Sequence, residues 1–351
     1  MRRHLIDMFH RFKVNKSDDM VQINHYGKGL AALLDPRHRE GLPNSIGEVD
    51  AIERRSSGIS LMASDQIKTS LVVATLGRIV ELEKLFKSLA DQDRSDFEVI
   101  VVDQNTDDRL APLCTAAWPF PVSRIHTPTA RGLSRARNAG LKVAKGELLL
   151  FPDDDCWYPR SFLSRGIELM STAQVDVLTG RAADEAGNDI NGKYSRAPHT
   201  ITRANVWVSG IEWVMLFRKT ALLAVNGFDD DVGVGASTPW QACEGQDILL
   251  RALDKGLKCR FDPTFFGHHP RFDDISAKAM QAKGRSYGRG LGYVLRVRRY
   301  GLVSAANWIG RPVISLLLSG ATGDLERCKY LFNVALGRLE GYLGRTFAPR
   351  S

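Results

Sequence analysis

The chain has 351 residues, of which 44% are hydrophobic and 25% charged, a composition typical of globular proteins and not of disordered or fibrous chains. Its five cysteines are widely scattered without a CxxC pair, which argues against a disulfide framework or a zinc site and indicates reduced thiols in a cytoplasmic protein. The net charge is +8, no signal peptide follows the basic start, and no apolar run is a clear membrane span, so export is not expected.

The first part of the chain differs in pattern from the rest. Residues 1–65 mix polar and charged side chains with one short apolar run, and we expect a flexible N-terminal extension. From residue 70 onward, short apolar runs alternate with helical periods, which is the signature of βαβ units. Strands are predicted at residues 71–74, 97–102, 123–126 and 148–151, and helices at residues 79–89, 107–116 and 133–144. This order predicts an α/β fold with a mostly parallel sheet flanked by helices and a Rossmann-like nucleotide-binding half.

The pattern becomes less regular further along the chain. Residues 175–179 predict another strand, and the polar stretch 182–205 predicts a loop that lies over the site. A strand at residues 213–217 and a short helix follow, and a glycine-rich turn then leads to a helix that residues 244–247 open.

Three consecutive carboxylates, Asp153, Asp154 and Asp155, come directly after the predicted strand at residues 148–151. Like charges packed this closely repel unless a cation or a solvated loop absorbs them, and Mg²⁺ uses one or two carboxylates together with substrate phosphates. The alternative is a solvated acidic turn before the helix predicted near residue 159. Thr75 and Asp103 also follow strands, and ligands of parallel sheets bind at such strand ends, so we expect one shared pocket.

Positive charge is concentrated near the end of the chain. Residues 275–323 hold eight lysines and arginines and no acidic residue, whereas the rest of the chain is neutral overall. A cationic segment this localised indicates an anionic surface or polymer as its partner.

An ordered series of six motifs resembles the inverting glycosyltransferases of family 2, of the bacterial cell-surface polysaccharide type. The motifs are SLVVATLGR, FEVIVVDQNTDD, RGLSRARNAGL, GELLLFPDDDCWYP, NGFDDDVGVG and EGQDILLRAL. The resemblance implies the glycosyltransferase A fold, with a catalytic domain at residues 66–273 and a C-terminal region of basic amphipathic helices at residues 274–351. It also implies transfer of a sugar from a nucleoside diphosphate donor, such as a UDP, GDP or dTDP sugar, to an acceptor hydroxyl with inversion.

The resemblance also implies roles for the residues at the strand ends. Thr75 and Asp103 contact the nucleoside base, Asp154 meets the ribose, and Asp155 reaches a Mn²⁺ or Mg²⁺ ion with Asp153 completing a DxD pair. Further residues expected beside the nucleotide are Arg131, Arg135, Arg137 and Asn138. Late histidines of related folds contact the metal or the diphosphate, which makes His268 and His269 candidates, although a structural role stays open for either. Trp240, like Trp157 and Trp213, is placed either against a sugar ring or in the core.

The catalytic base is the point at which this chain departs from the resemblance. The family carries an acidic pair followed two residues later by Asp, but the second acid of the pair is Gly245 here. The base is therefore expected to be Glu244 or Asp247, with Glu244 preferred, and a role of Asp247 at the positive end of the helix dipole stays open.

The C-terminal region mixes cations with aromatic and aliphatic residues. Such helices suit the anionic cytoplasmic face of the plasma membrane, so we expect a peripheral membrane protein that acts on a lipid-linked saccharide acceptor and not on nucleic acid. Packing of these helices on the catalytic domain, with a solvated basic face, is the alternative. Other functions left open are a sugar-nucleotide pyrophosphorylase, a non-catalytic polyanion-binding protein and a degenerate transferase that binds donor without turnover.

Overall fold

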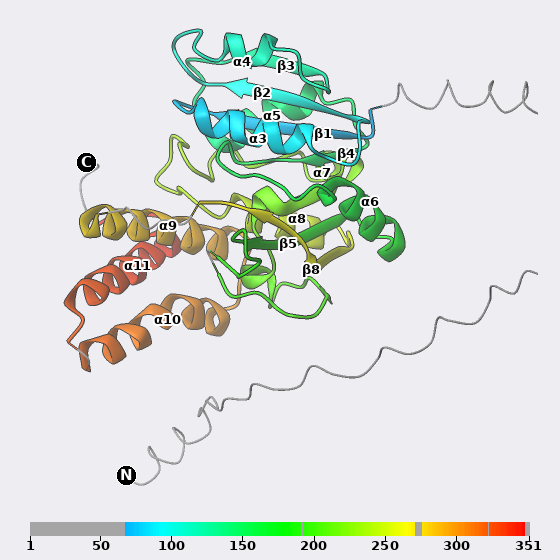
Figure 1. The fold of residues 1–351 in the computed structure, drawn as a ribbon. Coiled ribbons are helices and arrows are strands. Elements are labelled where there is room, and N and C mark those ends of the chain that lie inside the picture. Colours follow the sequence, from blue (N-terminus) through cyan, green and yellow to red (C-terminus); the bar gives the residue numbers. More distant parts are fainter. Residues whose placement is uncertain (1–66, 191, 271–275, 322, 348–351) are drawn as a thin grey trace, which may run out of the picture. The chain divides into compact units, whose positions relative to one another are not determined.

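The structure is a computed structural model that describes residues 67–190, 192–270, 276–321 and 323–347 (Figure 1). The chain divides into two units, Met1–Ile59 and Ser60–Ser351, and the described residues belong to the second. The predicted N-terminal extension at residues 1–65 lies outside the described residues.

Eight strands of the described residues form one mixed sheet with the order β3-β2-β1-β4-β7-β5-β8-β6. They are β1 (Thr69–Thr75), β2 (Phe97–Asp103), β3 (Val122–His126), β4 (Leu148–Leu150), β5 (Val177–Ala183), β6 (His199–Thr200), β7 (Met215–Arg218) and β8 (Cys259–His268). The first four strands pair in parallel, whereas β7 is antiparallel to both of its neighbours, β4 and β5. The prediction of a mostly parallel α/β sheet is confirmed.

Helices cover both faces of this sheet, which explains why its central strands are apolar without alternation. These helices are α3 (Val80–Ala90), α4 (Ala111–Thr115), α5 (Leu133–Val143), α6 (Phe162–Ala173), α7 (Lys219–Ala224) and α8 (Glu244–Asp254). Leu71 and Val73 of β1 pack with α3 and α6 in one core, whereas Val72 and Ala74 pack with α5, α7 and α8 in the other. Figure 1 shows α3 and α5 on opposite sides of β1 and β2.

The predicted elements between residues 182 and 217 are partly wrong. The stretch predicted as a loop contains the end of β5 and the short strand β6. The strand predicted from residue 213 begins only at Met215, because Glu212–Val214 form a 3-10 turn, η3. The hydroxyl of Tyr158 donates a hydrogen bond to the carbonyl of Trp213 at 2.6 Å and helps to fix this turn. Another 3-10 turn, η2 (Val206–Val208), precedes it.

Three helices complete the described chain: α9 (Ala277–Val297), α10 (Leu302–Ala321) and α11 (Leu325–Leu343). Glycines of α9 and α11 lie directly against the partner helix, so that a Cβ atom at Gly292 would be 2.0 Å from the carbonyl oxygen of Arg338. Glu340 of α11 is fully buried between Arg285 and Arg289 of α9, at 2.7 Å from a nitrogen of each. Two of the eight tail cations therefore neutralise an acid that lies outside residues 275–323, and the segment is less cationic than its sequence indicates.

Helix α10 continues through Pro312, which has no N–H group to donate to the carbonyl of Trp308 one turn earlier. Arg338 of α11 donates a hydrogen bond from Nη1 to that carbonyl instead. Within the described part of the chain, α10 is the one helix that is long and apolar enough to cross a membrane, judged by length and composition alone. Most of its side chains are exposed, including Leu302, Val303 and Leu317.

Candidate active site

The acidic triplet follows β4 at the edge of the sheet where the parallel strands end. Asp153 forms a backbone bridge with Ala74 near the end of β1, and the hydroxyl of Thr75 donates a hydrogen bond to Asp154 at 2.7 Å. The guanidinium group of Arg78, in the loop after β1, lies 2.8 Å from a carboxylate oxygen of Asp155 and also pairs with Asp154. The structure therefore brings Thr75 and the triplet together, with Arg78 as a counterion.

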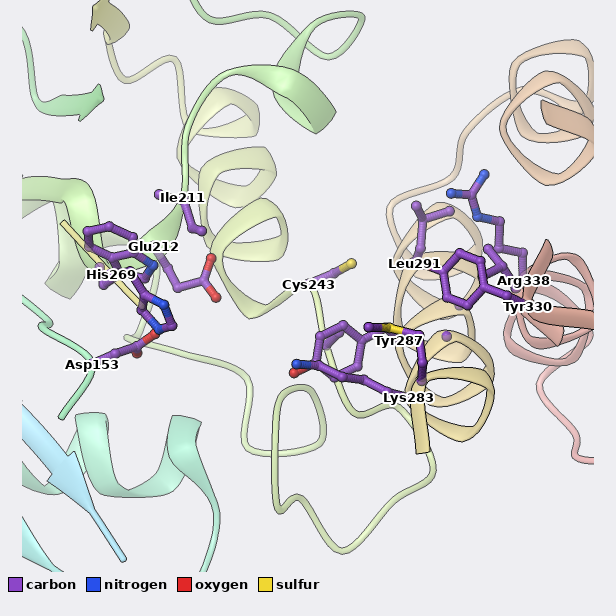
Figure 2. A pocket seen from close by; sticks show the side chains of 16 residues that line it. Asp153, Ile211, Glu212, Cys243, His269, Lys283, Tyr287, Leu291, Tyr330 and Arg338 are labelled. Atoms are coloured by element: carbon purple, nitrogen blue, oxygen red, sulfur yellow. The ribbon is translucent and has the colours of Figure 1, made fainter. Parts of the chain in front are cut away.

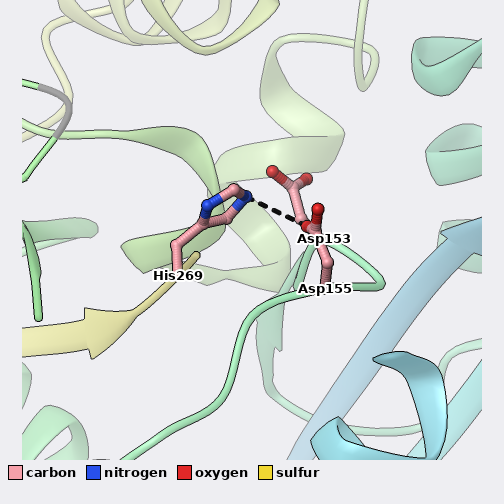
Figure 3. Close-up of side chains that lie close together, drawn as sticks. All are labelled: Asp153, Asp155 and His269. Carbon is pink, nitrogen blue, oxygen red and sulfur yellow. Dashed lines mark ion pairs between the residues drawn. The ribbon is translucent and has the colours of Figure 1, made fainter. Parts of the chain in front are cut away.

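His269 lies directly after β8 and completes a cluster of three possible metal ligands. Its Nε2 atom is 3.0 Å from a carboxylate oxygen of Asp155 (Figure 3). One ligand atom from each of Asp153, Asp155 and His269 lies within 4.8 Å of the others. Carboxylate oxygens suit Mg²⁺ and Mn²⁺, and imidazole is a common ligand of transition metals. The donor set therefore fits a divalent cation.

The protonation of this cluster follows from its burial. Burial raises the pKa of Asp153 to about 7, although the charge of Arg137 opposes the shift. Burial also acts to raise the pKa of Asp155, but the hydrogen bond and charge of His269 outweigh it and lower that pKa. The pKa of His269 is raised because Asp155 outweighs the opposite effect of burial. Asp155 and His269 are thus an ion pair, and a cation at this site would compete with bound protons.

Arg137 of α5 joins the triplet to Glu244, the first residue of α8. The Arg137 side chain is fully buried, with Nη2 at 3.1 Å from Asp153 and Nη1 at 3.5 Å from Glu244. Its Nε and Nη1 atoms have no hydrogen-bond partner among the described residues. Burial, reinforced by the charge of Glu212, raises the pKa of Glu244 to about 8 despite Arg137. The single guanidinium of Arg137 therefore pairs with two carboxylates, a half-buried one and a buried one, that compete for it.

The raised pKa of Glu244 predicts that the protein becomes less stable as the pH rises from 5 to 8. In this window the folded protein keeps a proton that the unfolded chain has released, so protons favour the folded state, and that contribution is lost toward pH 8. Glu244→Gln removes the titration, and its unfolding temperature should fall less over this range than that of the wild type. We expect a difference of at least about 2 °C, measured by thermal unfolding in metal-free buffer. Parallel curves for the two proteins would contradict the shift.

A cavity of about 490 Å³ extends from the acidic cluster to the C-terminal helices. Figure 2 shows Asp153, Glu212 and His269 on one side of it, and Leu291, Tyr330 and Arg338 on the other. Lys283 and Tyr287 of α9 lie between these two groups (Figure 2). The cavity therefore has an acidic end at the sheet and an aromatic and aliphatic wall that α9 and α11 supply.

Asp103 and Asp247, two of the predicted site residues, are held by arginines. The carboxylate of Asp103 is buried, lies 2.7 Å from Arg124 and accepts two hydrogen bonds from Asn105. Asp247 is also buried, with one oxygen 2.9 Å from Arg251 and the other 2.6 Å from Arg298 at the end of α9. Asp247 does not line the 490 Å³ cavity.

Three further residues, Asn138, Arg131 and Arg135, are predicted to lie beside the nucleotide. Asn138 exchanges hydrogen bonds with the backbone of Phe228 and so holds the loop after α7. Arg131 and Arg135 are exposed, and Arg135 lies 3.7 Å from Asp230.

The predicted tryptophans and His268 mainly make packing contacts. Trp240 stacks on Tyr293 at 4.9 Å between ring centroids, and Trp213 is buried in the core. His268 stacks on Trp157 and its Nδ1 atom lies 3.1 Å from the carbonyl oxygen of Ala183, so it is outside the metal-ligand cluster.

Four residues of the site are absent from the sequence prediction: Arg78, Glu212, Lys283 and Tyr287. Arg78 lies four residues after the end of the predicted strand at residues 71–74, so its position after a strand end was a usable signal. Glu212 is a single acid directly before the predicted strand at residues 213–217, and nothing in its neighbourhood distinguishes it. Lys283 and Tyr287 belong to the cationic segment, and only the packing of α9 against the catalytic half reveals their place.

Comparisons with known proteins agree with this geometry. Residues 70–226, just under half of the chain, match the sequence model of glycosyl transferase family 2. An uncharacterized glycosyltransferase of Haemophilus influenzae is 38% identical over 91 residues, which are 26% of this chain and 30% of that protein. The Escherichia coli protein UDP-Glc:alpha-D-GlcNAc-diphosphoundecaprenol beta-1,3-glucosyltransferase WfaP is 24% identical over 54% of this chain and 72% of its own length.

A solved structure shows the same fold. The mannosyltransferase PcManGT from Pyrobaculum calidifontis, determined in complex with GDP-Man and Mn²⁺, superposes with a TM-score of 0.53 at 16% identity. The superposition covers 78% of this chain and 87% of that one. The chain therefore contains a glycosyl transferase family 2 domain, matched over residues 70–226, and has the glycosyltransferase A fold.

Proposed function

We propose that this protein transfers a sugar from a nucleoside diphosphate donor to a hydroxyl group of a lipid-linked saccharide, with inversion, in bacterial cell-surface polysaccharide assembly. The observation that carries the proposal is the cluster of Asp153, Asp155 and His269 at the edge of the mixed sheet. The Mn²⁺ ion in the mannosyltransferase structure and the diphosphoundecaprenol in the name of the Escherichia coli relative support the donor and acceptor classes.

The donor is proposed to lie along the ends of β1, β2 and β4. Asp103, whose carboxylate is held by Arg124 at the end of β2, is proposed to mark the side of the base, and Asp154 offers an acceptor to a ribose hydroxyl next to Thr75. Asp153, Asp155 and His269 would hold the divalent cation, which offsets the charge of the diphosphate and assists its departure. Arg78 neutralises Asp154 and Asp155 in the absence of that cation.

The acceptor is proposed to enter the cavity from the side of α9 and α11. Inversion requires that its hydroxyl approach the anomeric carbon opposite the departing diphosphate while a carboxylate removes the proton. Residues from both sides of the predicted domain boundary line this cavity, because Asp153 comes from the sheet and Lys283 and Tyr287 come from α9 (Figure 2). We therefore propose that the C-terminal region takes part in acceptor binding.

The same region is proposed to hold the protein at the cytoplasmic face of the plasma membrane. Helix α10 exposes Leu302, Val303, Ile314, Leu317 and Leu318, and α11 adds Leu325 and Phe332. Arg311 lies over the ring of Trp308 at 3.8 Å, an arrangement that suits the interface between lipid and water. A membrane-bound position would bring the cavity close to a lipid-linked acceptor.

Calorimetric titration with UDP, GDP, dTDP and CDP tests this function. We expect one of these nucleotides to bind, and to bind at least about tenfold more tightly when Mn²⁺ or Mg²⁺ is present, because a cation held by Asp153, Asp155 and His269 would offset the charge of the diphosphate. The measurement needs neither the sugar nor the acceptor to be known. A protein that binds none of the four with either ion would refute the donor assignment.

A further inference from the structure

Glu212 occupies a central position that the sequence did not reveal. It lies in η3, between the acidic cluster and helix α8, and its side chain is partly exposed. It lines the 490 Å³ cavity together with Asp153 and His269, and a neighbouring cavity of about 280 Å³ together with Glu244 (Figure 2). Of the carboxylates in the described residues, it is the one that lines both cavities.

The other carboxylates around these cavities are held by cations. Asp153 and Glu244 share Arg137, and Asp154 and Asp155 share Arg78. The backbone carbonyl of Glu212 accepts a hydrogen bond from the N–H of Met215, but its side chain has no hydrogen bond and no ion pair to any described residue. A carboxylate that has no partner, yet borders a cavity, has both oxygens available to a ligand hydroxyl.

Gly245 leaves the space in which the Glu212 side chain lies. A Cβ atom built on Gly245 would be 3.0 Å from the Cβ atom of Glu212 and 3.1 Å from its Oε2 atom. Both distances are shorter than ordinary contacts, so a side chain at position 245 would displace Glu212. The resemblance places an acid at position 245, and here a carboxylate reaches the same place from η3.

We propose that Glu212 is the general base of the transfer reaction, a role that rests on the proposed function. The acceptor oxygen forms a bond to the anomeric carbon while the bond from that carbon to the diphosphate oxygen breaks. The acceptor proton passes to a carboxylate oxygen of Glu212, and the bonding electron pair leaves with the nucleoside diphosphate. Glu244 stays on Arg137 and positions it beside Asp153.

Moving the carboxylate from position 212 to position 245 tests the proposal. The reaction to follow is the release of nucleoside diphosphate from the donor sugar with water as acceptor, so that the natural acceptor is not needed. Glu212→Gln should lower kcat by about 10²–10⁴-fold and leave the Kd of the nucleotide within about twofold. Glu212→Ala should be equally slow. The double variant Glu212→Ala with Gly245→Asp should have a kcat at least about tenfold higher than that of Glu212→Ala.

The outcomes separate this proposal from the proposed function. A Glu212→Gln protein with unchanged kcat would overturn the role of Glu212, and a large loss in Glu244→Gln alone would move the base to Glu244. No recovery in the double variant, with normal nucleotide binding and thermal stability, would also count against the proposal. A wild-type protein that binds nucleotide and cation but releases no diphosphate from any donor would overturn the transferase function and this role with it.

Discussion

Asp155→Asn is expected to remove the cation dependence of nucleotide binding. The Asp155 carboxylate lies 3.0 Å from His269 and 2.8 Å from Arg78, at the centre of the ligand cluster. Asparagine keeps the size of the side chain but supplies no negative charge. Changes in the outer shell of a metal site typically lower metal affinity by about 10- to 100-fold, and loss of a charged ligand should cost more. We therefore expect the affinity for Mn²⁺ to fall by about 100-fold or more. Titration of the nucleotide with and without Mn²⁺, and of Mn²⁺ alone, measures the effect.

Asp262→Asn provides the matched control for this change. Asp262 is a buried carboxylate of β8 that accepts hydrogen bonds from the N–H and the hydroxyl of Thr264, and it lines none of the cavities described above. The control should keep the full cation dependence even where it lowers thermal stability. If Asp155→Asn kept the cation dependence as the control does, Asp155 would not be needed to bind the cation, and its assignment as a metal ligand would be wrong.

The features of the site that the sequence predicts are those that depend on strand ends. Thr75, Asp103 and the acidic triplet each end an apolar run, and parallel strands that pair in register bring such ends to one edge. The hydrogen bond between Thr75 and Asp154 follows directly from this arrangement. His269 follows β8 in the same manner, although β8 lies three strands away from β4 in the sheet.

The choice between Glu244 and Asp247 could not be made from their spacing. Three residues apart on a helix, they lie about 60° apart around its axis, so both point to the same broad face. The structure separates them by their partners, because Glu244 meets Arg137 of α5 whereas Asp247 meets Arg298 directly after α9, in addition to Arg251 of its own helix. These arginines come from distant parts of the chain, and no local pattern records which carboxylate each one approaches.

Glu212 and Glu340 escaped prediction for a related reason. Each is a single acid whose role depends on a distant segment, which leaves space for the side chain of Glu212 and supplies positive charges to Glu340. Glu212 fits because position 245 lacks a side chain, and Glu340 is buried because Arg285 and Arg289 lie opposite it. Charge counted along the sequence therefore overstated the basic surface of residues 275–323, since the compensating acid lies beyond that window.

The close packing of α9 on α11 predicts a large effect for the smallest possible substitution, Gly292→Ala. The added Cβ atom would lie 2.0 Å from the carbonyl oxygen of Arg338 and 2.7 Å from the backbone nitrogen of Tyr342. Backbone atoms cannot rotate away as a side chain can, so the two helices must move apart. Overpacking of this kind costs about 1–3 kcal/mol or more. Separation would also displace the cavity wall that Leu291, Tyr330 and Val334 form.

Gly310→Ala is the control, because it adds the same atom to a helical glycine of α10 that has nothing within 4 Å. The control should keep or slightly raise the unfolding temperature, since alanine favours a helix over glycine by about 1 kcal/mol. Gly292→Ala should lower it by several degrees and slow transfer to an acceptor, while nucleotide and cation binding at the sheet edge stay within about twofold of wild type. Equal unfolding temperatures for the two variants would show that α9 and α11 are not packed through these glycines. Loss of nucleotide binding together with transfer in Gly292→Ala would instead mean that the C-terminal helices support the donor site and not only the acceptor cavity.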